Sequence, residues 1–331
     1  MTTLVTGCAG FVGSSCVDRL LGDGERVIGI DNFSTGREDF LENATASKNF
    51  RLVRADLLDE AALNEAMRGV DTVFHFAANA DVRFGADHPT RDFEQNAKVT
   101  LNVLEAMRKA NVPRIAFSST GSIYGESTVI PTPEDAPIPI QTSLYGASKM
   151  AAEGFIEAYA EAFGIQAYIF RFVSLLGERY THGHVIDFYN QLVDHPEYLN
   201  VLGDGRQRKS YLYIADCIDA IFEAMRTATT RVHVYNLGTD AYCEVNDSIA
   251  WITATLGLEP KIVYSGGRQG WIGDNPFIFL DTARIRKTGW QPTLTIRAAI
   301  ERTVDHLRVK GGYRPRPQSA VTVNRNPSHI T

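Results

Sequence analysis

The chain has 331 residues and a formal net charge of −6 at pH 7, with 44% hydrophobic and 22% charged residues. This is the composition of an ordinary soluble protein of one or two domains, and the negative charge argues against nucleic acid, whose phosphates require a basic surface. No apolar run has the length of a membrane span and no signal peptide precedes the first strand, so we expect a cytoplasmic protein without membrane contact. The four cysteines lack paired spacing, which predicts reduced thiols.

The N-terminal segment predicts a strand, a glycine turn and a helix. An apolar, β-branched run leads into GCAGFVG at 7–13, after which apolar residues recur at helical spacing. Such a turn brings backbone N–H groups and the positive end of a helix to a phosphate. Gly7 would permit the tight turn, Gly10 the approach of a pyrophosphate, and Gly13 close packing of helix on strand. Because similar glycine turns also simply reverse a chain, this motif needs support from its neighbours.

The second predicted strand covers residues 26–30 and ends at Asp31-Asn32. A carboxylate about twenty residues after the glycine turn can accept hydrogen bonds from ribose hydroxyls. Its charge would repel a 2′-phosphate, so Asp31 favours NAD over NADP, although Arg37 lies near it in the sequence. Asp-Asn also begins many turns, which is the alternative interpretation of this pair.

Strands and helices continue to alternate, which predicts a parallel, doubly wound α/β sheet of the Rossmann type. Further strands are expected at 51–55, 72–76 and 114–118, and further helices at 59–68 and 92–110. Ligands bind such sheets outside the carboxyl ends of the strands. The residues predicted at those ends are Gly7, Asp31, Asp56, Ala77 with Ala78, and Ser118, and Thr120 directly follows the fifth strand. His75, inside the fourth strand, is interpreted as a buried, hydrogen-bonded core residue.

Residues 144–163 predict a helix, because they are rich in Ala, Glu and aromatic residues and contain no proline. On that helix Tyr145 and Lys149 share a face, since they are four residues apart. A phenol has a pKa of roughly 10 in water, and a neighbouring ammonium favours the phenolate. With Thr120 to hold a substrate oxygen, the group is predicted to transfer a proton to or from an alcohol or ketone. The alternative interpretation is that Tyr145 and Lys149 are ordinary surface residues of a helix. This alternative is less favoured, because the glycine turn and the Tyr145 helix are predicted to meet at the same edge of the sheet.

The organisation changes after residue 165. A strand at 165–170 could still belong to the large sheet, and shorter segments follow it, with helices expected at 185–194, 215–226 and 245–256 and a strand at 232–236. We interpret 1–170 as a dinucleotide-binding domain to which some later segments return, 171–310 as a smaller, interwoven α/β lobe that binds substrate, and 311–331 as a polar tail. His182 and His184 have no acidic or cysteine partner nearby, so no metal site is predicted.

Five motifs together resemble the extended short-chain dehydrogenase/reductases, and among them the nucleotide-sugar 4-epimerases of the UDP-glucose 4-epimerase type. They are TGxxGFVGS, the strand-ending Asp-Asn, SSTGSIYG, YGASK and LGDGRQRKSYLYIAD, and the resemblance covers about residues 1–310. It implies tightly held NAD, a UDP-sugar substrate, and Thr120, Tyr145 and Lys149 as the catalytic group. It also implies that Asp56 lies near the adenine, that Asn96 lies near the active site, and that helices 92–110 and 149–163 form a homodimer interface. From the sequence alone, the apolar stripes of these two helices could equally face the parent sheet.

The motifs also assign the remaining site residues. The cofactor is expected to contact Gly7, Gly10, Phe11, Val12, Gly13, Asp31, Asn32, Asp56, Leu57, Ala77, Ala78, Ser118, Tyr145 and Lys149. The substrate is expected to contact Thr120, Ser122, Tyr145, Ser174, Lys209 and Arg268. Ser174 and Lys209 replace the family's usual Asn and Arg, and 271–274 departs from its Arg-Pro-Gly-Asp motif, which leaves Arg268 as the nearest cation for a diphosphate.

The resemblance implies that NAD takes a hydride from C4 of the sugar while the Tyr145 phenolate takes the O4 proton. The 4-keto sugar then turns over and hydride returns to its other face. A UDP-glucuronate or other 4-epimerase stays open, with Thr120, Ser122, Arg83 and Arg179 as conceivable partners of a C6 carboxylate. A dehydratase or decarboxylase is less favoured, because Gly121-Ser122 stands where such relatives carry acids. A non-catalytic dinucleotide sensor would be expected to lack part of the catalytic group.

Overall fold

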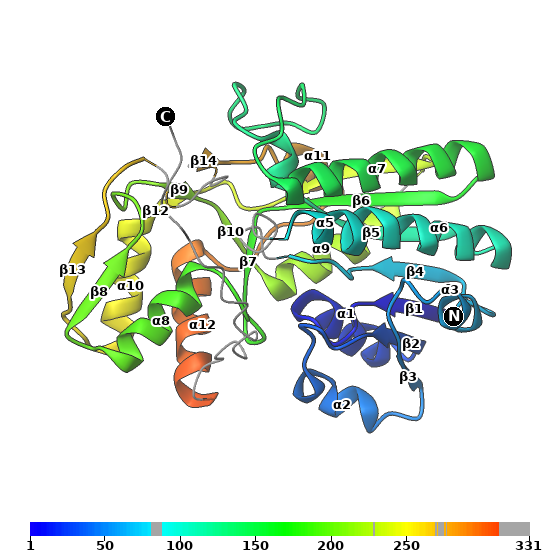
Figure 1. Ribbon diagram of the computed structural model, residues 1–331, viewed down its shortest axis with the longest axis horizontal. Coiled ribbons are helices and arrows are strands. Elements are labelled where there is room, and N and C mark those ends of the chain that lie inside the picture. Colours follow the sequence, from blue (N-terminus) through cyan, green and yellow to red (C-terminus); the bar gives the residue numbers. More distant parts are fainter. Residues whose placement is uncertain (81–87, 228, 269, 271–274, 276, 311–331) are drawn as a thin grey trace, which may run out of the picture.

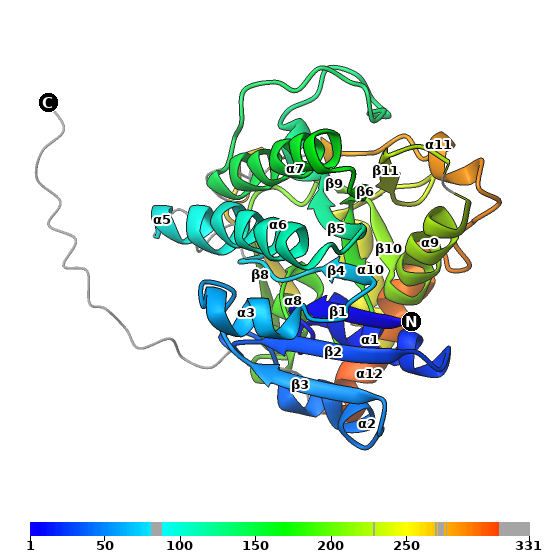
Figure 2. The ribbon, with the colours of Figure 1, turned by 90° about the vertical axis from the view of Figure 1, so that its right-hand side faces the viewer.

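The computed structural model describes residues 1–80, 88–227, 229–268, 270, 275 and 277–310. Within these residues, seven parallel strands form one sheet in the order β11-β6-β5-β4-β1-β2-β3, with helices on both faces (Figures 1 and 2). The predicted doubly wound sheet is therefore confirmed. Its strands are β1 (Thr2–Thr6), β2 (Arg26–Asp31), β3 (Phe50–Arg54), β4 (Thr72–His75), β5 (Arg114–Thr120), β6 (Gln166–Phe172) and β11 (Val232–Leu237).

Alternation along the strands produces two apolar cores, one on each face of the sheet. Leu4 and its neighbours on one face pack with the helices α3 (Glu60–Ala66), α6 (Val99–Ala110) and α7 (Leu144–Phe163). Val5 belongs to the other core, with α1 (Phe11–Gly22) and α9 (Ile214–Thr227). Because successive side chains of a strand point to opposite faces, both layers bury apolar surface against the same sheet.

Two predicted elements differ from those observed near the carboxyl ends of the strands. The helix expected at 92–110 is divided into α5 (Pro89–Asp92), a π-helical segment η2 (Phe93–Lys98) and α6. The Thr100 hydroxyl donates to the Asn96 carbonyl oxygen at 2.5 Å, a side-chain bond that accompanies the irregular turn. Strand β5 extends to Thr120, whose backbone still pairs with Phe172, so Thr120 ends the strand and does not follow it.

The later half of the chain contributes to both parts of the molecule. Strand β6 belongs to the large sheet, and β11 pairs with its outer edge. The other segments lie beside the sheet, at the left of Figure 1. They include α8 (His184–Asp194), α10 (Val245–Leu256), α12 (Ile296–Lys310), β7 (Ser174–Leu176), β8 (Tyr198–Val201), β9 (Arg208–Lys209), β10 (Tyr211–Tyr213), β12 (Cys243–Glu244), β13 (Lys261–Tyr264) and β14 (Phe277–Ile278).

Short helices complete the fold. They are η1 (Glu38–Leu41), α2 (Glu42–Thr45), η3 (Gly121–Tyr124) and α11 (Ala283–Arg286). None of the helices in the described ranges combines the length and the apolar character that crossing a bilayer requires. Arg83, the segment 271–274 and the tail 311–331 lie outside the described residues.

Candidate active site

The glycine turn between β1 and α1 is packed too closely for side chains. A Cβ on Gly7, whose φ is 66°, would lie 2.7 Å from the Ala77 backbone nitrogen. A Cβ on Gly13 would lie 2.0 Å from the Gly7 carbonyl oxygen. Helix α1 begins after Gly10, and no side chain among the described residues caps its first N–H groups. The turn therefore fits a pyrophosphate, which would accept hydrogen bonds from those groups.

The Asp31 carboxylate lies at the carboxyl end of β2, beside the glycine turn. Its oxygens accept hydrogen bonds from the backbone N–H groups of Ala9, at 2.9 Å, and Phe33, at 2.8 Å. Burial raises the pKa of this carboxyl above its ordinary value, although both hydrogen bonds oppose the shift. Arg37 makes a two-pronged ion pair with Asp39, at 2.8 and 2.7 Å, so its guanidinium is directed to a neighbour. This arrangement suits a ribose with free hydroxyls better than a 2′-phosphate.

The remaining cofactor candidates lie at the ends of neighbouring strands. Asp56 accepts a hydrogen bond from the Asn32 amide at 2.7 Å, which joins the ends of β2 and β3. The backbone N–H of Ala77, beside the half-buried Ala78, donates to the Thr6 hydroxyl at 3.2 Å. Phe11 and Val12 lie in the first turn of α1, and Leu57 is buried after β3.

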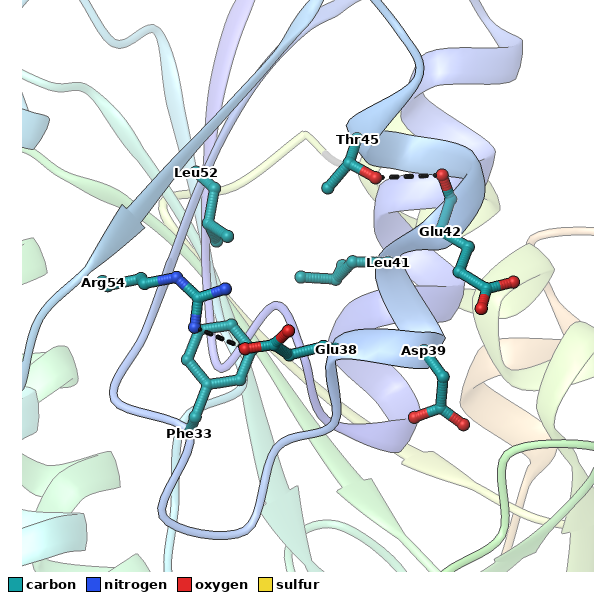
Figure 3. Close-up of a pocket in the computed structure, with 8 residues that line it drawn as sticks. All are labelled: Phe33, Glu38, Asp39, Leu41, Glu42, Thr45, Leu52 and Arg54. Atoms are coloured by element: carbon teal, nitrogen blue, oxygen red, sulfur yellow. Dashed lines mark hydrogen bonds and ion pairs between the residues drawn. The ribbon is translucent and has the colours of Figure 1, made fainter.

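A separate cavity of about 320 Å³ lies between β3 and the short helices η1 and α2 (Figure 3). Inside it the Arg54 guanidinium lies 4.4 Å above the Phe33 ring and 2.8 Å from Glu38. Three carboxylates on its rim argue against a phosphate ligand. None of the predicted site residues lines it, since the lining consists of Phe33, Glu38, Asp39, Leu41, Glu42, Thr45, Leu52 and Arg54.

The three predicted catalytic residues meet where β5 ends and α7 begins. Ser143 caps α7, because its hydroxyl accepts the Gly146 N–H at 3.0 Å, and this places Tyr145 in the first turn. The Thr120 side chain hydrogen-bonds the Tyr145 hydroxyl and also accepts the Ser122 backbone N–H at 3.1 Å. Lys149 is buried, and its Nζ donates to the Ser118 carbonyl oxygen at 2.7 Å. Ser118, a predicted cofactor contact, thus orients the lysine.

The electrostatics of this group differ from the sequence-based expectation. Burial raises the pKa of Tyr145 to about 12, Asp92 adds to the rise, and the bond from Thr120 opposes it. Burial also lowers the pKa of Lys149 to about 7, against the attraction of Glu153 and Asp92. In the protein without ligands the phenol's pKa therefore lies above its ordinary value, and the lowering expected from Lys149 stays a prediction. The cause is desolvation, which disfavours the charged form of each group.

Asn96 connects the π-helical segment to the catalytic helix. Its side chain donates to the Ser148 hydroxyl at 2.9 Å, and its oxygen accepts the Asn79 N–H at 2.8 Å. Ser148 in turn donates to the Tyr145 carbonyl oxygen at 2.8 Å, and the Asn79 amide donates to Asp92 at 2.8 Å. Asn79 and Ser148 were not predicted as site residues, although Asn79 directly follows Ala77-Ala78 at a strand end.

A second hydrogen-bond network confirms the structural interpretation of His75. The ring is fully buried between the hydroxyls of Thr6, at 2.7 Å, and Thr100, at 3.0 Å. Thr100 donates its own proton to Asn96, so it accepts from His75 Nε2–H, and the ring is neutral with Nδ1 as acceptor. Burial lowers the pKa of His75 to about 3, which agrees with this state.

The predicted substrate residues are more dispersed. The Ser122 hydroxyl lies 3.1 Å from that of Thr120, whereas Ser174 is exposed on β7. Lys209 donates to the Asn275 carbonyl oxygen at 2.7 Å, and Arg268, whose side chain is 79% exposed, lies 3.5 Å from Glu126.

Arg179 and His184, two further polar residues of the lobe, each contact a neighbouring side chain. Arg179, a conceivable carboxylate ligand, makes an ion pair with Asp18 at 2.6 Å. The His184 ring hydrogen-bonds the Tyr211 hydroxyl at 2.8 Å. Within the described ranges, no three His, Cys, Asp or Glu side chains gather as metal ligands.

The dinucleotide-type sheet, the glycine turn and the Thr120, Tyr145 and Lys149 group together define an enzyme of the extended short-chain dehydrogenase/reductase class. Residues 3–238 match the model of the NAD dependent epimerase/dehydratase family. The chain belongs to that family, and the predicted NAD cofactor is confirmed at the level of the family.

Similarity to individual proteins narrows the class. UDP-glucose 4-epimerase from Mycolicibacterium smegmatis is 32% identical, covering 94% of this chain and 99% of its own length. A crystal structure of a UDP-galactose 4-epimerase has 36% identity and a TM-score of 0.84, covering 94% of this chain and 99% of that one. UDP-glucuronic acid 4-epimerase from Bacillus cereus, in complex with UDP-glucuronic acid and NAD, has 26% identity and a TM-score of 0.86, covering 94% and 100%. Relatives named UDP-glucuronic acid decarboxylase also match. The predicted enzyme class, an isomerase that epimerises nucleotide sugars, is confirmed by these relatives.

Proposed function

We propose that this protein is a 4-epimerase of UDP-sugars of the UDP-glucose/UDP-galactose type. The observation that carries the proposal is the meeting of Thr120, Tyr145 and Lys149 at the end of β5, at the same sheet edge as the glycine turn. An alcohol held there would have a proton acceptor on one side and the cofactor on the other.

Each catalytic side chain has a separate task. Bound NAD⁺ supplies the acceptor that takes a hydride from C4 of the sugar and later returns it. Tyr145 moves the O4 proton, and Thr120 holds that oxygen through the hydroxyl that already bonds the phenol. Lys149 lies four residues after Tyr145 on the same helix, and its ammonium is proposed to stabilise the phenolate that the reaction requires. Because the chain alone raises the phenol's pKa to about 12, this stabilisation must grow when cofactor and substrate fill the site.

The lobe formed by 171–310 is proposed to hold the nucleotide diphosphate while the sugar turns over. Lys209 and Arg268 of the lobe supply positive charge and Ser174 supplies a hydroxyl. Ser122, outside the lobe, adds a hydroxyl from beside Thr120. Anchoring through the nucleotide leaves the 4-keto sugar free to present either face to the cofactor.

A neutral hexose is favoured over a uronate by one contact. Arg179, one of the cations conceivable for a C6 carboxylate, is already paired with Asp18. The similarity to UDP-glucuronic acid 4-epimerase keeps the uronate as a second candidate. Dehydration and decarboxylation are less favoured, because Gly121 and Ser122 place no acid beside Thr120. The intact Thr120, Tyr145 and Lys149 group argues against a non-catalytic sensor.

The test is a product screen by NMR on UDP-glucose, UDP-galactose and UDP-glucuronate with the purified holoenzyme. We expect inversion at C4 of UDP-galactose, with transient absorbance of bound NADH at 340 nm. Turnover confined to UDP-glucuronate would move the assignment to the uronate. NADH formation without any C4 inversion would refute epimerisation.

We further propose a homodimer through the outer faces of α6 and α7, which lie side by side on one flank of the sheet (Figures 1 and 2). Phe155 and Phe163 on α7 are 38% and 52% exposed. Exposing large aromatic side chains to water is unfavourable, so these two residues are candidates for burial in an interface. Substituting both with Glu should produce a monomer in analytical ultracentrifugation. Val309→Glu on α12, at a residue that is 79% exposed, is the control, and a wild-type monomer would overturn the proposal.

A further inference from the structure

A buried ion pair lies directly behind the catalytic group. Glu153 on α7 and Arg171 on β6 are 3% and 5% exposed, and their closest nitrogen and oxygen atoms are 2.7 Å apart. Removing two charges from water is expensive, and the attraction between them repays that cost only if their other hydrogen-bonding atoms are satisfied. A buried ion pair is therefore weak evidence for a stabilising role. The contacts of Glu153 and Arg171 indicate a different role.

Arg171 is held in one orientation by partners besides the carboxylate. Its Nη1 donates to the Tyr124 hydroxyl at 2.6 Å and to the Glu134 carbonyl oxygen at 2.8 Å. The Tyr124 hydroxyl in turn donates to Asn236 Oδ1 at 2.9 Å, on β11. The guanidinium on β6 is thereby tied to η3 and, through Tyr124, to β11, and it offers Glu153 a fixed cation.

Glu153 also accepts a hydrogen bond from the Ser119 hydroxyl. Ser119 lies between the two residues of β5 that organise the catalytic group. Its predecessor Ser118 receives the Lys149 ammonium at 2.7 Å, and its successor Thr120 hydrogen-bonds the Tyr145 hydroxyl. A shift of Ser119 would therefore move both contacts at once.

Glu153 is one helical turn after Lys149 and shares its face. Its negative charge favours the ammonium, whose pKa burial lowers to about 7. The charged or titratable groups around this lysine are Asp92 on α5, His75 on β4, Tyr145 and Glu153 on α7, and Arg171 on β6 behind Glu153.

We propose that Glu153 is a positioning residue for the proposed epimerase, on which this inference rests. By bridging Arg171 to Ser119 it fixes the end of β5 that holds Lys149 and Thr120, and it supplies the carboxylate that keeps Lys149 charged. Its carboxylate contacts Ser119 and Arg171, behind the catalytic group, and we infer that it acts through them without contacting the sugar. Its loss should therefore act on kcat and on the pH profile and leave KM for the UDP-sugar nearly unchanged.

The test compares Glu153→Gln with Glu161→Gln, the same change two turns later at an exposed position of α7. We expect the introduced carboxamide to fill the space of the carboxylate without its charge, so that the alkaline limb of kcat moves about one pH unit lower, a tenfold change at a fixed alkaline pH. KM should stay within about twofold, because the nucleotide anchor is elsewhere. An equal fractional loss of kcat at every pH would overturn the proposal.

Ser119→Ala keeps the ion pair and removes only its link to β5, so it serves if Glu153→Gln fails to fold. We expect a lower kcat with KM unchanged, restored by Ser119→Thr, which keeps a hydroxyl. Wild-type kcat in Ser119→Ala would contradict the positioning role.

Failure of the proposed function would be recognised separately, as a wild type that turns over no nucleotide sugar. In that case the pH dependence of the unfolding free energy of the holoenzyme still tests whether the Glu153 carboxylate keeps Lys149 charged. The unfolded chain binds more protons than the folded one between the lowered pKa of Lys149, about 7, and its ordinary value of 10.5, so stability rises with pH there. In Glu153→Gln that rise should begin at lower pH, and an unchanged onset would overturn the inference.

Discussion

Replacing Gly13 with alanine should damage cofactor binding through a single steric contact. A Cβ at this position would lie 2.0 Å from the Gly7 carbonyl oxygen, whereas real Cβ contacts essentially never fall below 3.0 Å. Helix α1 must therefore move about 1 Å away from the glycine turn, an overpacking that typically costs about 1–3 kcal/mol of unfolding free energy. The same movement lengthens the hydrogen bonds that the first turn of α1 would donate to a pyrophosphate. Losing one such charge-assisted bond costs about 1.5–3 kcal/mol, or roughly ten- to a hundredfold in NAD affinity.

The assay is urea unfolding with and without added NAD, together with the NAD content of the purified protein. Gly22→Ala is the matched control, because Gly22 ends the same helix and an added Cβ there meets no atom within 4 Å. It should retain NAD and gain up to about 1 kcal/mol from the better helix propensity of alanine. The reasoning is wrong if Gly13→Ala binds NAD as tightly as the wild type and unfolds within about 0.5 kcal/mol of it.

Two further predictions concern charge. Asp31→Asn should raise the affinity for NADP relative to NAD at least about tenfold in competition binding, because the repulsion of a 2′-phosphate is lost. Asp305→Asn, at an exposed residue of α12, is the control, and an unchanged ratio in Asp31→Asn would exclude Asp31 as the discriminator. His75 has a pKa lowered to about 3 in the fold, against 6.5 ordinarily, so the unfolded chain binds more protons between these values and stability falls as pH drops from about 6.5 towards 3. His75→Gln should flatten that fall relative to His195→Gln, at an exposed residue, and equal slopes would contradict the buried neutral ring.

The alternating strands and helices were predictable, because the spacing of apolar residues and the glycine turns are local properties of the sequence. Helix 144–163 was predicted at its observed limits from its composition, and the structure shows that Ser143 caps it and that Gly164 ends it in the left-handed region. The division of helix 92–110 was not predictable, because it accompanies a hydrogen bond from Thr100 that no periodicity reveals. The residue types at 120, 145 and 149 indicated the chemistry.

The pKa values in the site could not be predicted from spacing. A pair four residues apart predicts mutual stabilisation, but both Tyr145 and Lys149 are desolvated by the fold, and burial has the larger effect. The Glu153–Arg171 ion pair behind them could not be predicted from the sequence, because Glu153 lies on α7 and Arg171 lies on β6. The one local signal was an acid four residues after Lys149.

The most direct test compares C4 inversion of UDP-galactose by wild type, Tyr145→Phe and Tyr159→Phe, followed by NMR with NAD content checked in each. Tyr159 lies on the same helix and bonds Glu105 at 2.6 Å, so its loss should leave turnover nearly intact. Loss of the phenol at 145 should reduce kcat by about 10²–10⁴-fold with NAD still bound. Inversion by Tyr145→Phe at the wild-type rate would contradict the account.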